Sequence, residues 1–140
     1  MASKNTHLTQ AKHNEKLANK LLSGEYHDWA CTTAFYAALH YVEAKFYDIP
    51  EIVHGDDAFM RNKQFMKEMD INMGVHLFRE VTLKGKYPLL RDYYRHLREV
   101  SFQVRYLENV DKAACDFIHI DIAKRLVKND LTKIKKGLGF

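Results

Sequence analysis

Arginine and histidine side chains lie close together in the stretch YPLLRDYYRHLREVSFQVRYL, residues 87–107. These two residue types could cleave RNA without a metal. A histidine can take the proton of a 2′-hydroxyl, and an arginine can stabilise the charge that develops on the phosphorus centre. The candidate pair is Arg91 and His96, which are five positions apart.

Residues 87–107 are expected to form one long helix, and this helix decides where the pair points. Pro88 suits the first helical position, because its missing N–H would be unpaired there anyway. Positions five apart on a helix point about 140° away from each other, so Arg91 and His96 would not easily share a pocket within one subunit. Asp92 and His96, one turn apart, are instead placed to form an ordinary surface pair. The alternative to catalysis is therefore that both residues only pack and face solvent.

The same helix carries an apolar face with a row of arginines beside it. The apolar positions recur at steps of three and four: Leu90, Tyr93, Leu97, Val100, Val104 and Leu107. The arginine row falls within about 80° of arc at 100° per residue: Arg91, Arg95, Arg98 and Arg105. We expect the apolar face to pack on other helices, and the arginine row to meet either a polyanion or solvent.

A second set of candidate residues lies earlier, in VHGDDAFMRNKQFM: His54, Arg61 and Asn62. Other kinds of site are not indicated. The chain has no glycine-rich phosphate loop, no HExxH and no cluster at metal-ligand spacing. It has two cysteines, Cys31 and Cys115, without CxxC spacing. We therefore predict no cofactor and no metal.

Positive charge is concentrated in the second half of the chain. Residues 1–83 carry 9 Lys/Arg against 11 Asp/Glu, a net −2, and residues 84–140 carry 13 against 7, a net +6. The sum is the overall +4. A basic half favours RNA, a nucleotide or an acidic protein as partner. The alternative is that these side chains merely solvate the outer faces of helices.

The predicted fold is all-α, a single domain over residues 1–140 that forms an antiparallel bundle of four to five helices. The expected helices besides 87–107 are 3–22, 26–47, 57–69 and 111–136, and residues 75–83 could be a short helix or irregular. The helix over 26–47 is apolar on most sides and should be central. His40 within it is expected to be a hydrogen-bonded histidine of the core or an interface. No apolar run approaches the roughly 18 residues of a membrane span, and the polar start lacks a signal-peptide pattern, so we expect a cytoplasmic protein.

Three segments resemble a known superfamily. DWACTTAFYAALHYVEAKF, residues 28–46, resembles the signature second helix of the HEPN superfamily (higher eukaryotes and prokaryotes nucleotide-binding domains). YYRHLREVSFQVRY resembles the arginine-rich, tyrosine-terminated helix of small HEPN proteins. VHGDDAFMRNKQFM is similar to a His-then-Arg-Asn segment of some members. Together the segments follow the same order over most of residues 10–110.

The resemblance implies a HEPN-like helical bundle that binds RNA or a nucleotide and forms a homodimer. Active members carry an arginine, a polar residue and then a histidine, with the site assembled across the dimer, and Arg91, Asp92 and His96 match that spacing. Together with the residue patterns above, the candidate catalytic residues are Arg91, His96, His54 and Arg61, and the candidate nucleic-acid contacts are Arg91, Arg95, Arg98, Arg105 and Asn62. Such motifs commonly lie later, where residues 101–106 contain no histidine, so a binding-only domain is an alternative to a metal-independent ribonuclease.

The resemblance also implies a partner protein. Many members pair with a small nucleotidyltransferase as toxin and antitoxin, so a cognate nucleotidyltransferase antitoxin is a candidate partner. A different functional class stays open as well, in which the chain is a non-catalytic dimerisation or protein-interaction module that uses the aromatic helix over 26–47.

Overall fold

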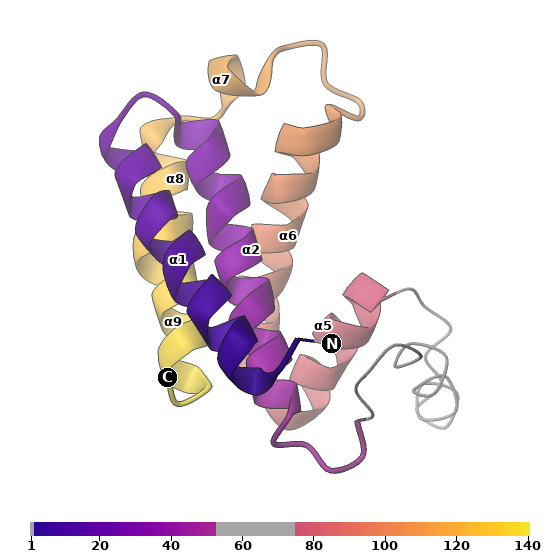
Figure 1. Ribbon diagram of the computed structural model, residues 1–140. Coiled ribbons are helices and arrows are strands. Elements are labelled where there is room, and N and C mark those ends of the chain that lie inside the picture. The colour runs from indigo at the N-terminus through magenta and orange to yellow at the C-terminus, as the bar shows by residue number, and fades with distance from the viewer. Residues whose placement is uncertain (1, 53–74) are drawn as a thin grey trace.

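The computed structural model describes residues 2–52 and 75–140, with side chains of the second range described from Phe78 onward. The regular elements in these ranges are all helical, which confirms the predicted all-α class. They are α1 Lys4–Ser23, α2 His27–Phe46, α5 Val75–Lys86, α6 Pro88–Tyr106, α7 Ala114–Phe117, α8 Ile120–Lys124, the π-helical η1 Arg125–Asp130, and α9 Leu131–Gly137. Figure 1 shows α1, α2, α6 and the α8–α9 segment running alternately up and down, so that neighbouring long helices are antiparallel.

Helix α2 is the centre of the bundle, as its apolar composition predicts. Twelve of its 20 residues are buried, and it contacts α1, α6 and α9. Its small residues are buried inside the fold, where they allow neighbouring helices to approach closely: Ala30, Ala34, Ala37 and Ala38, each with no exposed surface.

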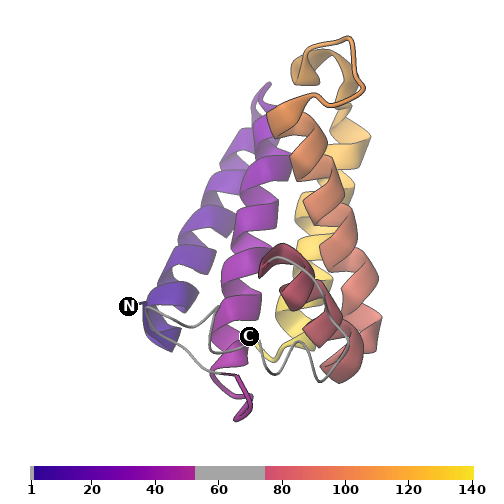
Figure 2. The ribbon, with the colours of Figure 1, turned by 90° about the vertical axis from the view of Figure 1, so that its right-hand side faces the viewer.

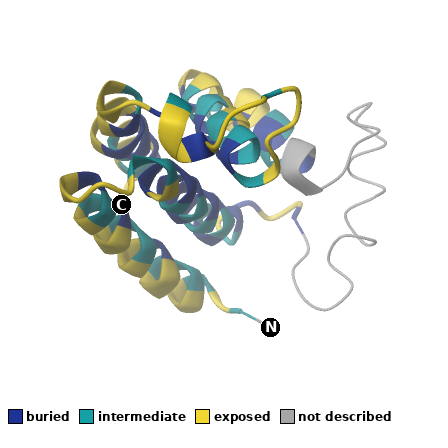
Figure 3. Ribbon diagram, turned by 90° about the horizontal axis from the view of Figure 1, so that it is seen from above, coloured by how far each residue is buried: buried dark blue, intermediate teal, exposed yellow. Residues whose placement is uncertain are grey.

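Helix α1 lies along one side of α2 and is exposed on its outer side (Figure 3). Its buried positions include Ala11 and Ala18. Near its start, His7 Nδ1 lies 2.9 Å from His40 Nδ1, so one ring donates a hydrogen bond to the other. This confirms the expectation that His40 is hydrogen-bonded. Burial and the neighbouring His7 hold the pKa of His40 below its usual value.

Residues 75–83, for which the sequence left helix or irregular structure open, form the first part of helix α5. It packs against α6 and lies in front of the lower parts of α2 and α6 in Figure 2. Phe78 contacts the edge of Phe46 with ring centroids 5.9 Å apart, and Arg79 forms an ion pair with Glu43. Both contacts join α5 to α2.

Helix α6 begins at Pro88, as predicted, but its buried face is rotated toward the arginine row. The buried residues are Leu90, Tyr94, Leu97, Ser101 and Val104. Tyr94 is completely buried, whereas Tyr93 only packs at the edge of the core and Leu107 is 40% exposed. The apolar spacing alone predicted Tyr93 and Leu107. Tyr94 packs against Phe35 of α2, with ring centroids 5.8 Å apart, and α5 covers the arginine side of α6. The buried face of α6 therefore lies closer to the arginine row than the apolar spacing predicts.

The prediction of one continuous helix over 111–136 is wrong at its start. The short α7 is separated from α8 by Ile118 and His119, whose backbones are extended. Both Ala114 and Ile118 are buried, and the break lets α7 fold over the end of the bundle that Figure 1 shows at the top. From Ile120 the chain stays helical to Gly137, with the π-helical turns of η1 in the middle.

Candidate functional site

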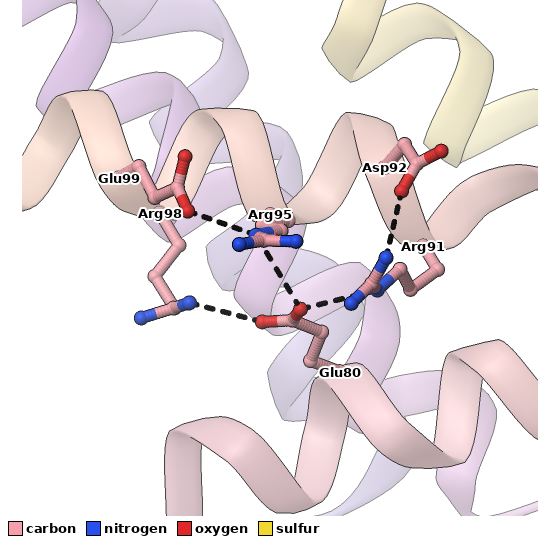
Figure 4. Close-up of polar contacts among 6 residues, drawn as sticks. All are labelled: Glu80, Arg91, Asp92, Arg95, Arg98 and Glu99. Atoms are coloured by element: carbon pink, nitrogen blue, oxygen red, sulfur yellow. Dashed lines mark hydrogen bonds and ion pairs between the residues drawn. The ribbon is translucent and has the colours of Figure 1, made fainter.

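A buried carboxylate lies at the centre of the arginine row (Figure 4). Glu80 of α5 has a side chain that is only 6% exposed. Arg98 Nη2 donates a hydrogen bond to its Oε2 at 3.0 Å. Its Oε1 forms ion pairs with Arg91 Nε at 3.1 Å and with Arg95 Nε at 3.9 Å. Three guanidinium groups on successive turns of α6 therefore converge on one carboxylate of α5.

Two exposed carboxylates pair with the outer sides of the same arginines. Arg91 Nη1 lies 3.1 Å from Asp92 Oδ1, and Arg95 Nε lies 2.8 Å from Glu99 Oε1. Three arginines thus meet three carboxylates, and their formal charges cancel. The pattern on α6 alone does not reveal this balance, because Glu80 comes from a segment whose helical state the sequence left open. A role of this row in binding nucleic acid stays a prediction.

Arg105, the fourth member of the row, lies among aromatic rings and joins α6 to α2. It donates hydrogen bonds to the Tyr36 hydroxyl at 3.0 Å and to the Ser101 carbonyl at 3.2 Å. Its guanidinium carbon lies 5.0 Å from the ring centroid of Tyr106 and 5.8 Å from that of Phe35. Cation–π contacts and hydrogen bonds within the chain therefore occupy this side chain.

His96 is held by a buried aspartate that the sequence did not point to. Its Nδ1 lies 2.8 Å from Asp130 Oδ2, and the Asp130 side chain is 1% exposed. Asn129 Nδ2 donates to the other oxygen, Oδ1, at 2.8 Å. The predicted surface pair of Asp92 with His96 is wrong, since Asp92 instead contacts Arg91. Asp130 ends η1, and π-helical turns inside α-helices are frequent at functional sites.

The aspartate fixes which tautomer the neutral imidazole adopts. Because a carboxylate only accepts hydrogen bonds, Nδ1 of His96 is the donor, and the neutral ring then carries its lone pair on Nε2. Nε2 has no hydrogen-bond partner among the described residues. A histidine oriented in this way, with a free Nε2, is suited to accept a proton from a ligand.

A pocket of about 620 Å³ lies beside this histidine. Its walls come from the outer side of α6 and from the segment around the break between α7 and α8; they include His96, Arg98, Phe102, Gln103, Phe117 and Ile122. We call it the His96 pocket. Gln103 has a buried Oε1 without a hydrogen-bond partner in the described part of the chain. A ligand with an N–H or O–H group could satisfy that oxygen.

The structure does not bring Arg91 and His96 together within one chain. Arg91 contacts Glu80 of α5, whereas His96 contacts Asp130 of η1. Arg98 is the arginine that lines the same pocket as His96. The second predicted set, His54, Arg61 and Asn62, lies outside the described residues.

The His, Cys, Asp and Glu side chains outside the arginine row and the His96 pocket form no further site in the described ranges, and one of the two cysteines is buried. Residues 2–52 and 75–140 contain no group of three or more His, Cys, Asp or Glu side chains placed to hold a metal ion. Cys31 is buried, and burial raises the pKa of its thiol to about 12, which leaves it protonated and unreactive near neutral pH. None of the described helices combines the length and the apolar character needed to cross a membrane.

Comparison with family models, with curated proteins and with solved structures finds no match to this chain.

Proposed function

We propose that the chain binds RNA or a nucleotide in the His96 pocket. The observation that carries the proposal is the contact of His96 with the buried Asp130 at the wall of that pocket. Burying an aspartate is costly unless it is firmly hydrogen-bonded. Asp130 accepts one hydrogen bond from its neighbour Asn129, and its other oxygen orients the imidazole of His96. The rings of Phe102 and Phe117 offer faces for a base. Arg98 lines the same pocket; its Nη2 donates to Glu80, whereas its Nη1 has no hydrogen bond within the described residues and can donate to a phosphate.

Metal-independent cleavage of RNA is the second candidate function, and the state of His96 favours it. Nε2 of His96 would take the proton of a 2′-hydroxyl, whose oxygen then attacks the adjacent phosphorus. The bond from phosphorus to the 5′-oxygen breaks, which leaves a 2′,3′-cyclic phosphate, and the departing 5′-oxygen takes a proton from water. Arg98 lines the same wall, and its Nη1, which does not contact Glu80, would donate to the phosphate oxygens on which charge builds. In this arrangement Arg98 replaces Arg91 as the arginine that acts with His96. The proposed site therefore lies within one chain.

A non-catalytic interaction module is the alternative, favoured by exposed aromatic side chains. Tyr26 and Trp29 at the start of α2 are 62% and 53% exposed, and Tyr106 at the end of α6 is 59% exposed. The start of α2 and the end of α6 lie at the same end of the bundle in Figure 1. Phe35, in contrast, is fully buried within the chain. The predicted homodimer and nucleotidyltransferase partner belong to this alternative or would accompany RNA binding.

The test measures both binding and cleavage of end-labelled single-stranded RNA in EDTA. We expect His96→Ala to abolish any metal-free cleavage and to weaken binding of a nucleoside monophosphate at least tenfold. Asp130→Asn keeps the shape but not the charge of the residue that orients His96, so cleavage should fall by about two orders of magnitude.

The matched control is His13→Ala, which removes an exposed histidine of α1. It should leave binding and cleavage unchanged. RNA binding without cleavage would retain the binding function alone. If wild type binds neither RNA nor a mononucleotide, while Trp29→Ala abolishes self-association or capture of a protein partner, the interaction module replaces the proposal.

A further inference from the structure

A second basic region lies on α1, away from the elements that form the His96 pocket. Lys12, Lys16 and Lys20 follow one another at four-residue intervals, so they lie about 6 Å apart along one side of the helix. Together with Lys135 of α9 they line a groove of about 560 Å³. We call it the lysine groove.

Only one carboxylate lines this groove, and it is already engaged. Glu15 accepts a hydrogen bond from the Tyr41 hydroxyl at 2.5 Å, and it lies 3.3 Å from Lys135 Nζ. The remaining three lysines, Lys12, Lys16 and Lys20, have no ion pair within the described ranges. The groove therefore keeps a formal charge of about +3 available to a ligand, in contrast to the arginine row.

A neighbouring lysine extends the basic surface across the bundle. Lys128 of η1 donates a hydrogen bond to Asn19, which also lines the groove. Asn19 itself is fixed because its amide nitrogen donates to the Glu15 carbonyl at 2.9 Å. The basic groups on α1, η1 and α9 are thus tied together by contacts that leave the charges of Lys12, Lys16 and Lys20 unpaired.

The chemistry of the groove identifies its ligand class. The lining side chains are lysine, glutamate, asparagine and serine, without an aromatic ring on which a base could stack. Lysine side chains commonly contact phosphate oxygens, and such contacts carry no sequence information directly. Without an apolar side chain in the lining, the groove also lacks the groups that membrane-surface helices insert among lipids. We propose that the lysine groove binds the phosphate backbone of RNA, independently of sequence, as a second contact region in addition to the His96 pocket.

The inference rests on the proposed function for its ligand, RNA, but uses different residues. The test measures binding of a fluorescent single-stranded RNA of mixed sequence by anisotropy, in KCl from 50 to 300 mM. The variant is Lys12→Gln with Lys16→Gln and Lys20→Gln, because glutamine keeps helix propensity and removes the charge. Each phosphate contact on a single strand contributes about 0.7 to the slope of log K against log salt. We expect the slope to fall by about 2 and the affinity at 100 mM KCl to fall at least tenfold.

Two further variants separate the groove from general charge and from folding. A charge-matched control, Lys84→Gln with Lys86→Gln and Lys112→Gln, should leave the slope within 0.5 of wild type. Changing Lys12, Lys16 and Lys20 to arginine should preserve binding. All variants should keep the wild-type thermal midpoint. If the glutamine variant does not, the test uses the arginine variant and the single change Lys16→Gln, for which the salt slope should fall by about 0.7.

The outcomes distinguish the lysine groove from the His96 pocket. If the glutamine variant keeps full RNA affinity while His96→Ala loses it, the groove proposal is overturned and the pocket stands. If the glutamine variant loses RNA affinity while His96→Ala changes neither mononucleotide binding nor cleavage, the groove stands and the pocket proposal fails. Equal losses in the groove variant and its charge-matched control would also overturn the groove. So would lysine-dependent binding to vesicles with anionic lipids but not to RNA.

Discussion

The arginine row of α6 and the lysine groove of α1 differ in what surrounds their charges. Arg91, Arg95 and Arg98 converge on the buried Glu80 and are flanked by two further carboxylates. Lys12, Lys16 and Lys20 of α1 share a groove with one carboxylate, that of Glu15, which already contacts Lys135 and Tyr41. Arg91, Arg95 and Arg98 thus form a charge-balanced network, whereas Lys12, Lys16 and Lys20 keep positive charge that is available to a ligand.

This difference shows why the distribution of charge along the chain is a poor guide to a binding surface. Residues 84–140 carry a net +6, yet their arginines are neutralised in part by Glu80 from the acidic half. Residues 1–83 carry a net −2, yet they contribute Lys12, Lys16 and Lys20 of the groove, which have no ion pair within the described residues. Tertiary contacts decide which cations remain free, because a buried carboxylate attracts the guanidinium groups around it strongly.

The largest effect is expected from Glu80→Ala, which would break the balance of the arginine row. Removing one partner from a buried ionic network leaves charges uncompensated, so the free energy of unfolding should fall by about 3 kcal/mol. The arginines would at the same time become available, and the salt dependence of RNA binding should become steeper. Urea unfolding and anisotropy titrations measure the two effects.

Glu99→Gln is the control for that change, because Glu99 is exposed and, among the described residues, its ion pair is with Arg95 alone. It should alter stability by less than about 0.5 kcal/mol. A similar loss in both variants would mean that Glu80 is not the centre of the network.

A smaller effect is expected from Tyr41→Phe, which tests whether Glu15 influences the charge of the lysine groove. The change deletes the hydrogen bond from the buried tyrosine to Glu15 and should cost about 1 kcal/mol in urea unfolding. RNA affinity and its salt slope should stay at wild-type values, because Lys12, Lys16 and Lys20 do not depend on Glu15 for their charge. A marked change of slope would show that Glu15 controls the groove and would contradict the picture of three independent lysines.

The smallest effect is expected from a change of pH. Helix α1 is joined to α2 through the titratable pair His7 and His40, whereas α5 and α6 are joined through Arg–Glu pairs. The pKa of His40 is lower in the folded chain than its unfolded value of about 6.5. The unfolded state therefore binds the proton first. This contribution to stability is complete above about pH 6.5 and is lost as the pH falls toward the lower folded pKa.

Urea unfolding at pH 7.5 and pH 5.5 measures this loss. His40→Gln should reduce the difference between the two pH values, whereas His13→Ala, on the exposed side of α1, should keep the wild-type difference. An unchanged pH dependence in His40→Gln would assign the acid sensitivity to other groups.

The local pattern of residues was sufficient for the elements whose periodicity is strong. The apolar character of residues 26–47 predicted a central helix, and α2 is buried on most sides. Pro88 and the spacing of apolar residues predicted the start and length of α6. The predicted helix over 111–136 failed at its start, because the burial of Ala114 and Ile118 against the end of the bundle decides the break before α8.

The sequence by itself determined an all-α chain and an arginine row on one side of α6, because both follow from helical periodicity within a single segment. Only the tertiary structure decided the partners of that row and of His96. Glu80 is 11 or more positions from the arginines, and Asp130 is 34 positions from His96. Contacts at such separations depend on which helices pack together and in which rotation. The same packing left Lys12, Lys16 and Lys20 of α1 without carboxylate partners among the described residues, so their charges, unlike those of Arg91 and Arg95, are available to a ligand.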